Sequence, residues 1–246
     1  MRSRRSLLLL LLLIPAARSP AQDPAAILER ATLFGRSPDL VARVLLSIHA
    51  AGGVKERELE VSLRRRAGTP IELLMRVVSP AFLSEMAYLS SRDADGRENR
   101  WLKTSRGVRK LSQTDRGERL FDSDFSVEDV SPFVAEEYAL RYAGAEELSG
   151  FRCDLVEAVR KGGSATRRLV WVETETALLR RVDTFDAGGR LVKRYLLVDT
   201  QRIGSEVYPM TCTMETFGEK TRTVLTFRAV RTDLVLPDKT FSRGNL

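Results

Sequence analysis

The residue types that most often carry enzymatic chemistry are scarce in this chain of 246 residues. It contains one histidine, His49, and two cysteines, Cys153 and Cys212, which lie far apart in the sequence. A nucleophilic triad or a Cys/His centre would have to use His49, and the spacing of these residues fits no zinc site. No glycine-rich phosphate loop follows a predicted strand. The sequence therefore predicts no catalytic residue, no metal site and no cofactor, and it favours a binding protein over an enzyme.

A short acidic segment in the middle of the chain has the best-specified local structure. Ser126 can cap the N-terminus of a helix, and Asp129, three residues later, can complete a capping box. Phe125 and Val130 stand at the two positions of a hydrophobic staple. Because Pro132 cannot continue a helix, this helix must be short. We therefore expect a short helix from residue 127 whose entry is fixed by these cap and staple residues.

The first 21 residues have the features of a secretory signal peptide. Arginines precede an apolar run over residues 7–14, and the small residues Ser19 and Ala21 occupy positions −3 and −1 of a cleavage site. The run is too short to span a bilayer. We expect export and cleavage near Ala21. The mature chain, residues 22–246, should form one domain, since it contains no linker-like tract and no internal repeat.

The leader also accounts for much of the positive charge. It holds four of the 40 basic residues and none of the 33 acidic ones, so the mature chain has 40 − 4 = 36 basic residues and a net charge of 36 − 33 = +3. A balance so close to neutrality does not require nucleic acid as a partner.

Export makes a disulfide between Cys153 and Cys212 chemically possible. Strand parity places Cys153 on one face with Phe151 and Leu155, and Cys212 on one face with the methionines of its own strand. If both faces point inward, the cysteines could form a disulfide or could be buried separately as small apolar side chains. The sequence leaves both alternatives open, because it does not give the Cα separation that a disulfide requires.

The hydrophobic pattern predicts few helices and many strands. Apolar residues at helical spacing predict helices over residues 24–34 and 38–49, in addition to the helix at 127–134. Elsewhere, alternation with a period of two predicts about ten or eleven strands joined by short turns, such as the one over residues 186–189. Short connections favour an antiparallel meander. The expected fold class is α+β, with the helices covering one face of the sheet or filling its concavity.

Apart from the initiator, every methionine occupies an apolar strand position. These residues are Met75, Met86, Met210 and Met214. Methionine is flexible and adapts to irregular apolar surfaces. Two interpretations are open: the strands line a cavity for an apolar ligand of variable shape, or the methionines fill gaps in an ordinary core.

Residues 120–130, Leu-Phe-Asp-Ser-Asp-Phe-Ser-Val-Glu-Asp-Val, resemble the GSDFSYEDL signature of the LolA-like family of bacterial outer-membrane lipoprotein-sorting proteins. Asp122 stands where the signature has glycine, and Val127 stands where it has tyrosine. The likeness spans nearly the whole mature chain. Weaker matches in the family's order are residues 79–82, 101–103, 150–157, 170–172 and 237–242.

The resemblance implies a strongly curved, half-open antiparallel β-sheet, an incomplete barrel, with helices over its concave face. In this family the cavity takes up lipid or the acyl chains of lipoproteins in the periplasm. The resemblance thus implies a periplasmic carrier. We hypothesise that the predicted helices at 39–48 and 127–134 form its lid, the second fixed by Phe125, Ser126, Asp129 and Val130. The expected lipid-binding residues are Leu73, Met75, Met86, Tyr88, Trp101, Met210 and Met214.

Such a carrier would work as a monomer between an inner-membrane transporter and an outer-membrane acceptor, with peripheral membrane contact. The alternative is an interaction module. In that case the chain is a periplasmic sensor, or an accessory protein of an envelope transporter, that uses the same fold for protein–protein contacts.

Overall fold

Thirteen antiparallel strands form one continuous sheet in the computed structural model, which describes residues 22–66, 71–92, 95, 97–162 and 166–246. The predicted signal peptide lies outside the described residues. The strand order is β6-β5-β4-β3-β2-β1-β13-β12-β11-β10-β9-β8-β7. The strands are β1 (Asp39–Ala50), β2 (Gly53–Arg64), β3 (Glu72–Ser79), β4 (Ala87–Arg92), β5 (Glu98–Thr104), β6 (Gly107–Leu111), β7 (Tyr138–Leu148), β8 (Phe151–Arg160), β9 (Arg167–Glu173), β10 (Leu179–Phe185), β11 (Leu191–Ile203), β12 (Glu206–Thr216) and β13 (Thr221–Arg231).

Only short helical segments accompany the sheet. The described residues form α1 (Pro24–Arg30), α2 (Val127–Val130) and the 3₁₀ turns η1 (Ala81–Leu83), η2 (Gln113–Gly117), η3 (Ala135–Glu137), η4 (Asp238–Phe241) and η5 (Arg243–Asn245). None of these helices has the length and apolarity needed to cross a membrane.

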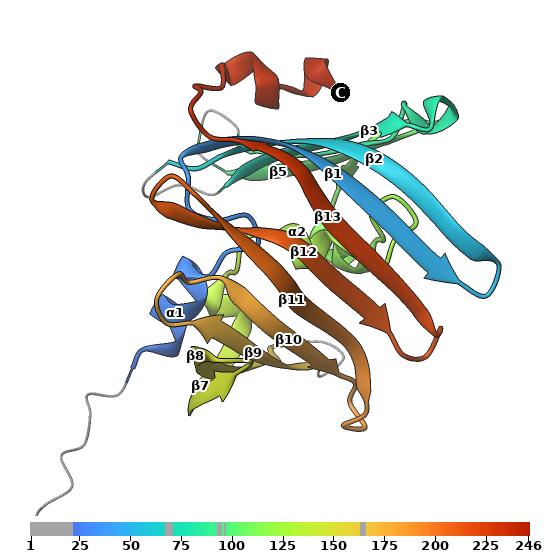
Figure 1. Cartoon of the computed structure of the whole chain (residues 1–246). Coiled ribbons are helices and arrows are strands. Elements are labelled where there is room, and N and C mark those ends of the chain that lie inside the picture. Colours follow the sequence, from blue (N-terminus) through green and yellow to red (C-terminus); the bar gives the residue numbers. More distant parts are fainter. Residues whose placement is uncertain (1–21, 67–70, 93–94, 96, 163–165) are drawn as a thin grey trace, which may run out of the picture.

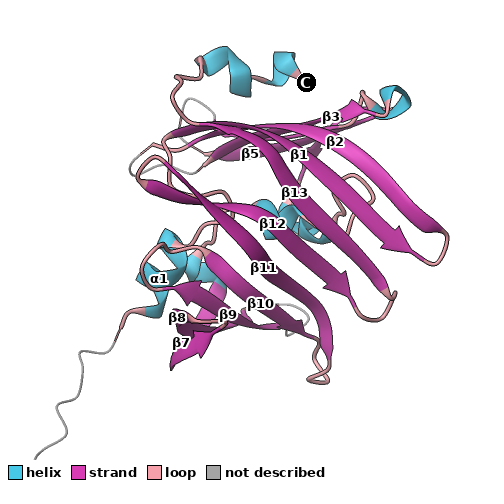
Figure 2. Cartoon of the chain, viewed as in Figure 1, coloured by secondary structure: helices cyan, strands magenta, loops and turns pink. Residues whose placement is uncertain are grey.

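The sheet is strongly curved, and its two halves bend around α2 (Figure 1). The largest cluster of buried apolar side chains fills this inner side. α1 packs against β7 and β8, also on the inner side, whereas η4 lies on the outer side of β3 and β4 (Figure 2). The expected half-open antiparallel sheet with short helices on its concave side is confirmed, with more strands than the ten or eleven expected.

The predicted helix over residues 38–49 is wrong, because this segment is the central strand β1. Leu40, Val44 and Ile48 recur every four residues, a spacing that fits one side of a helix and also one face of a strand. β1 pairs with β2 along its whole length and also with β13, so both of its edges are occupied. These long-range ladders outweigh the local pattern. The segment is therefore part of the sheet and cannot serve as a lid.

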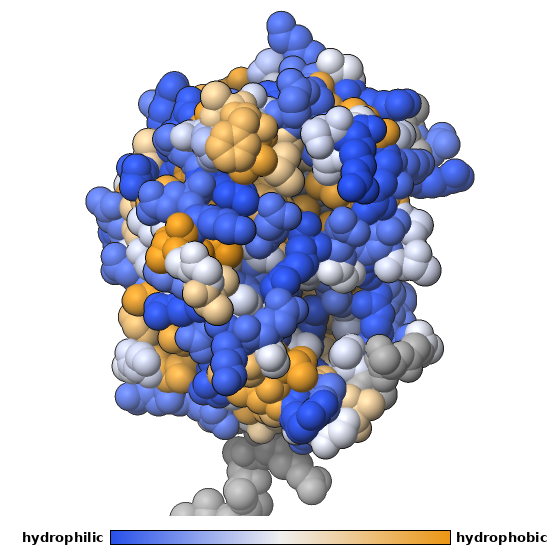
Figure 3. All heavy atoms as spheres, turned by 90° about the vertical axis from the view of Figure 1, so that its right-hand side faces the viewer, coloured by the Kyte–Doolittle hydropathy of each residue, from blue (hydrophilic) through white to orange (hydrophobic). Residues whose placement is uncertain are grey.

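One end of the sheet carries exposed apolar side chains on its hairpin tips. The β1–β2, β3–β4, β5–β6 and β12–β13 connections lie at this end, which faces the viewer in Figure 3. Apolar atoms form small patches there within a largely hydrophilic surface (Figure 3). Phe82, in the β3–β4 connection, is 83% exposed. The other large apolar residues exposed at this end are Val54, Val78, Val108 and Phe217.

The two cysteines are separate thiols on opposite faces of the sheet. Cys153 is buried with Leu155 and Trp171 on the outer face, whereas Cys212 belongs to the large inner cluster. No disulfide can join them, because the sheet itself lies between the two side chains. Burial raises the pKa of the Cys153 thiol to about 11 and that of the Cys212 thiol to about 12.

Both thiols should therefore be unreactive in the folded protein, because the thiolate is the reactive species. We expect a chromogenic disulfide reagent to titrate neither cysteine under native conditions and both of them in guanidinium chloride. An intact mass that lacks two hydrogens under non-reducing conditions would contradict this result.

Candidate functional site

One connection crosses the concave face between the two edges of the sheet. β6 and β7 form opposite edges although they are consecutive in sequence. The connection between them passes over the inner face, where Leu120, Phe121 and Phe125 are buried in the large inner cluster. We call residues 118–133 of this connection the crossover segment. Arg119 forms a β-bridge with Ser126, and the Leu120 backbone N–H donates to the Phe125 carbonyl oxygen at 2.8 Å. The segment is thus a tight loop that leads into α2.

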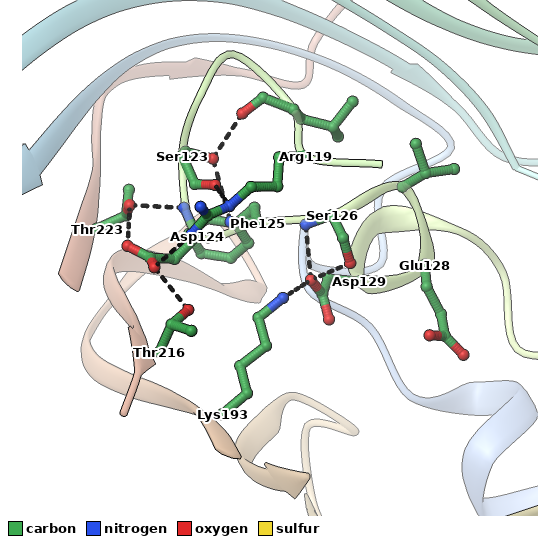
Figure 4. Close-up of polar contacts among 12 residues, drawn as sticks. Arg119, Ser123, Asp124, Phe125, Ser126, Glu128, Asp129, Lys193, Thr216 and Thr223 are labelled. Atoms are coloured by element: carbon green, nitrogen blue, oxygen red, sulfur yellow. Dashed lines mark hydrogen bonds and ion pairs between the residues drawn. The ribbon is translucent and has the colours of Figure 1, made fainter. Parts of the chain in front are cut away.

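A buried carboxylate ties the crossover segment to β12 and β13. The Asp124 side chain is fully buried, and its Oδ1 accepts a hydrogen bond from the Thr216 hydroxyl at 2.6 Å (Figure 4). The same oxygen accepts a hydrogen bond from the Thr221 hydroxyl at 2.5 Å. Its Oδ2 accepts from the Thr223 hydroxyl at 2.7 Å, and Arg119 adds an ion pair at 3.2 Å. Hydrogen bonds to an ionised group are stronger than neutral ones, so this cluster is a firm attachment point.

The crossover segment enters α2 through the predicted capping box. Oδ2 of Asp129 accepts the Ser126 backbone N–H at 2.7 Å and the Ser126 hydroxyl at 2.6 Å (Figure 4). Phe125 is buried in the large inner cluster, and Val130 packs against that cluster. The cap therefore fixes where the helix begins, and the two apolar residues hold it against the core.

Two carboxylates of α2 form ion pairs with strands of the opposite wall. Arg168 of β9 lies 2.8 Å from Glu128 and 4.0 Å from Asp129, and the ammonium group of Lys193 of β11 contacts Asp129. Burial opposes the ionisation of Asp129, but Lys193 and Arg168 outweigh it and hold the pKa of this carboxyl below its ordinary value of 3.8. We call these four side chains the latch.

The main cavity lies between the crossover segment, the residues that follow α1 and the strands β8 to β12. It contains about 1060 Å³ of empty space, part of it open to solvent, and the centre of a water molecule can move within about 140 Å³. Its wall is largely apolar, with charged groups added by Arg116 and by the latch. Apolar residues of the wall include Leu33, Phe34, Val170, Val182, Tyr195 and Met214.

A smaller cavity adjoins the main one and contains about 430 Å³ of empty space, part of it open to solvent. It lies between the loop of the crossover segment and the central strands, where Met75, Phe125 and Cys212 contribute to its wall. Both cavities share Phe34 and Tyr195 as lining residues. Together they form an apolar interior beneath the crossover segment.

Six of the seven predicted lipid-binding residues lie on the inner face. Met214 lines the main cavity, and Met75 lines the smaller one. Burial raises the pKa of Tyr88 to about 12, so its hydroxyl stays neutral. The residues that lie within or against the large inner cluster, but not in the walls of these two cavities, are Leu73, Met86, Tyr88 and Met210.

Trp101 lies on the other face of the sheet, which corrects its expected place among the cavity residues. It stands opposite Leu89 in the β4–β5 ladder and packs in an outer cluster with Leu74 and Phe241. Its neighbour Leu102 stands opposite Tyr88 and is the inward-facing residue of β5. Both residues of this pair are apolar, so composition alone does not reveal which one faces inward.

Sequence reasoning missed the polar part of the site and most of the cavity wall. The turn over residues 186–189 is predicted by the sequence, but a bulge between Thr184 and Phe185 shifts the register, so the turn alone does not place Val182 opposite Tyr195. No comparable signal connects Asp129 with Lys193, because their contact depends on the path of the crossover segment.

Comparison with known proteins places the fold. A family model described as "Uncharacterized protein" matches residues 72–246. No curated protein matches the sequence. A DUF1329 family protein from Desulfovibrio piger shares the fold with a TM-score of 0.75 and 23% identity, over 90% of this chain and 95% of that one.

Two further solved structures are similar. A putative outer membrane lipoprotein-sorting protein domain from Vibrio parahaemolyticus has a TM-score of 0.76 and 18% identity, over 89% of this chain and 94% of that one. A LolA superfamily protein from Nitrosomonas europaea has a TM-score of 0.68 and 18% identity, over 92% of this chain and all of that one. At these identities the likeness concerns the fold.

Replacing the buried carboxylate should destabilise the protein. We expect Asp124→Asn to lower the free energy of unfolding by about 2–3 kcal/mol, because the hydroxyls of Thr216, Thr221 and Thr223 lose a charged acceptor. Asp122→Asn is the matched control, since the Asp122 side chain is 70% exposed and its ion pair with Arg57 should contribute less than about 1 kcal/mol. Urea unfolding measures both, and equal losses would contradict the anchoring role of Asp124.

The latch should also give stability a defined pH dependence. The pKa of Asp129 is lowered in the folded state, so the unfolded chain binds this proton more readily, and the stabilisation is present above pH 3.8. We expect Asp129→Asn to cost about 3 kcal/mol at pH 7. The difference from the parent should shrink as the pH falls below 3.8, through the lowered pKa. Urea unfolding from pH 7 to pH 3 tests this expectation, and a difference that does not change with pH would refute it.

Proposed function

Since the chain belongs to the family described as "Uncharacterized protein" and has the LolA-like fold, we propose that it is a periplasmic carrier of a lipid or of lipoprotein acyl chains. The observation that carries this proposal is the main cavity, an apolar space between the curved sheet and the crossover segment. Further support comes from a solved structure with the same fold that is described as a lipoprotein-sorting domain. The mature protein would be residues 22–246, released after cleavage near Ala21.

Apolar burial supplies the driving force for a carrier of this kind. Each CH₂ group removed from water contributes about 0.8 kcal/mol, so a chain of roughly sixteen carbons gains more than about 10 kcal/mol before the cost of association. Van der Waals contact with flexible side chains such as Met214 allows the wall to follow chains of different shape. The protein therefore acts by binding rather than by chemical conversion.

Loading and release require access to the cavity, and the crossover segment is the element we assign to this step. Its α2 is four residues long and is held at the cavity by the latch. Asp124 attaches the preceding loop independently, through three threonines. Separation of the latch would swing α2 away from the cavity while Asp124 keeps the loop in place, as a hinge does. The carrier would be loaded by an inner-membrane transporter and emptied at an outer-membrane acceptor.

A second candidate function is an interaction module, either a sensor or an accessory of an envelope transporter. The exposed apolar residues at the hairpin-tip end favour it, above all Phe82 with 83% of its surface exposed. Exposed apolar side chains gathered at one end of a molecule are typical of contact with a protein or a membrane. This surface is separate from the main cavity, so contact through it is compatible with the carrier function.

The carrier proposal predicts bound lipid and uptake of an acyl probe. We expect organic extraction of the purified mature protein to release lipid that mass spectrometry identifies, and the emptied protein to bind a fluorescent fatty acid. Val182→Trp should weaken this binding at least about tenfold, because Val182 lines the main cavity and a larger ring would occupy the space of the ligand.

Val198→Trp is the matched control, since Val198 lies on the neighbouring strand and 56% of its surface is exposed to solvent. It should bind the probe as the parent does. Circular dichroism and a thermal melt confirm that both variants are folded. The carrier proposal fails if no lipid is extracted and no probe binds, or if a folded Val182→Trp protein binds as well as the control.

A further inference from the structure

The inner face of β9 to β12 changes from apolar to polar within one pleat. Residues that stand opposite each other in an antiparallel ladder point to the same side of the sheet. The register therefore defines two adjacent rows that cross these strands. The apolar row is Val170, Val182, Tyr195 and Met214. The polar row, two residues further along each strand, is Arg168, Thr184, Lys193 and Thr216.

Both rows contribute to the wall of the main cavity. All four residues of the apolar row line it, as do Arg168, Thr184 and Lys193 of the polar row. The cavity is therefore amphipathic along the strand direction. Its polar end is positive on the sheet side, because the two charged residues of the polar row are both cations.

The carboxylates that neutralise these cations come from the crossover segment and not from the sheet. Glu128 and Asp129 lie on α2, whereas Arg168 and Lys193 are held on the rigid strands β9 and β11. Only 19% of each cationic side chain is exposed. A cation so poorly hydrated needs an anionic partner whenever α2 moves away, because an unpaired charge at this depth is costly.

We propose that the main cavity selects a single-chain amphiphile with an anionic head group, whose oxygens replace the α2 carboxylates at Arg168 and Lys193. The chain would then follow the apolar row toward Tyr195 and Met214. This inference rests on the proposed carrier function and adds the chemical class of its ligand. Arg168 suits a carboxylate or a phosphate, because its guanidinium can donate two parallel hydrogen bonds. The incoming head group binds Arg168 and Lys193 in place of the two α2 carboxylates. Ligand entry and the release of α2 therefore occur in a single exchange of ion-pair partners.

The test compares ligands that share one acyl chain and differ in head-group charge. A fluorescent fatty acid bound to the emptied protein is displaced by palmitate, by monopalmitoylglycerol or by palmitoyl lysophosphatidic acid. We expect palmitate or the lysophosphatidate to displace the probe at a concentration at least about tenfold lower than neutral monopalmitoylglycerol does. The stronger of the two anionic ligands identifies carboxylate or phosphate as the preferred group.

The variants Arg168→Gln and Lys193→Gln should lose this preference, so that anionic and neutral ligands with the same acyl chain displace the probe at similar concentrations. Lys193→Arg keeps the charge and should keep the preference, which separates head-group binding from damage to the fold. Arg222→Gln removes an exposed cation of β13 and serves as the charge-matched control. Equal displacement by anionic and neutral ligands overturns the inference and leaves the carrier function standing, whereas the absence of any acyl binding refutes both.

Discussion

The shape of the concave face depends on the buried carboxylate of Asp124. β6 and β7 are opposite edges of one sheet, and their connection runs over the concave face, where polar backbone is costly unless it finds partners. Asp124 supplies them, with hydroxyls of β12 and β13 on both oxygens and a backbone N–H that donates to Thr223. The loop that it holds down delivers α2 to the strands that carry Lys193 and Arg168.

Apolar and ionic contacts have different consequences on this face. The apolar side chains stabilise the structure in proportion to the apolar area that they bury. They therefore favour the closed arrangement, in which α2 packs against the sheet. An ion pair such as Lys193–Asp129 has a small net free energy relative to the same charges in water or paired with other ions. The cost of desolvating both charges offsets their attraction. Another anion can therefore replace an α2 carboxylate at modest cost. The position of α2 is thus sensitive to a ligand in a way that the strand ladders are not.

The elements that local rules specify were predictable, and those set by distant partners were not. The capping box at Ser126 and Asp129 needs only neighbouring residues, and it forms at the predicted place. β1 was mistaken for a helix because its apolar residues satisfy both periods, and only pairing with β2 and β13 decides between them. Trp101 failed for a related reason, since two adjacent apolar residues leave the inward face of β5 undefined. The latch joins segments that no sequence pattern connects.

The open sheet and the path of the crossover segment have the same cause, which is that β6 and β7 do not pair. Closure into a barrel would require β6 to pair with β7, but β6 has five residues and β7 has eleven, so most of β7 would stay unpaired. The edges instead remain apart, and the chain that joins them covers the gap. Displacement of α2 would uncover the cavity without breaking any strand ladder of the sheet, because α2 belongs to none of them. An opening of this kind costs a few side-chain contacts rather than local unfolding of strands.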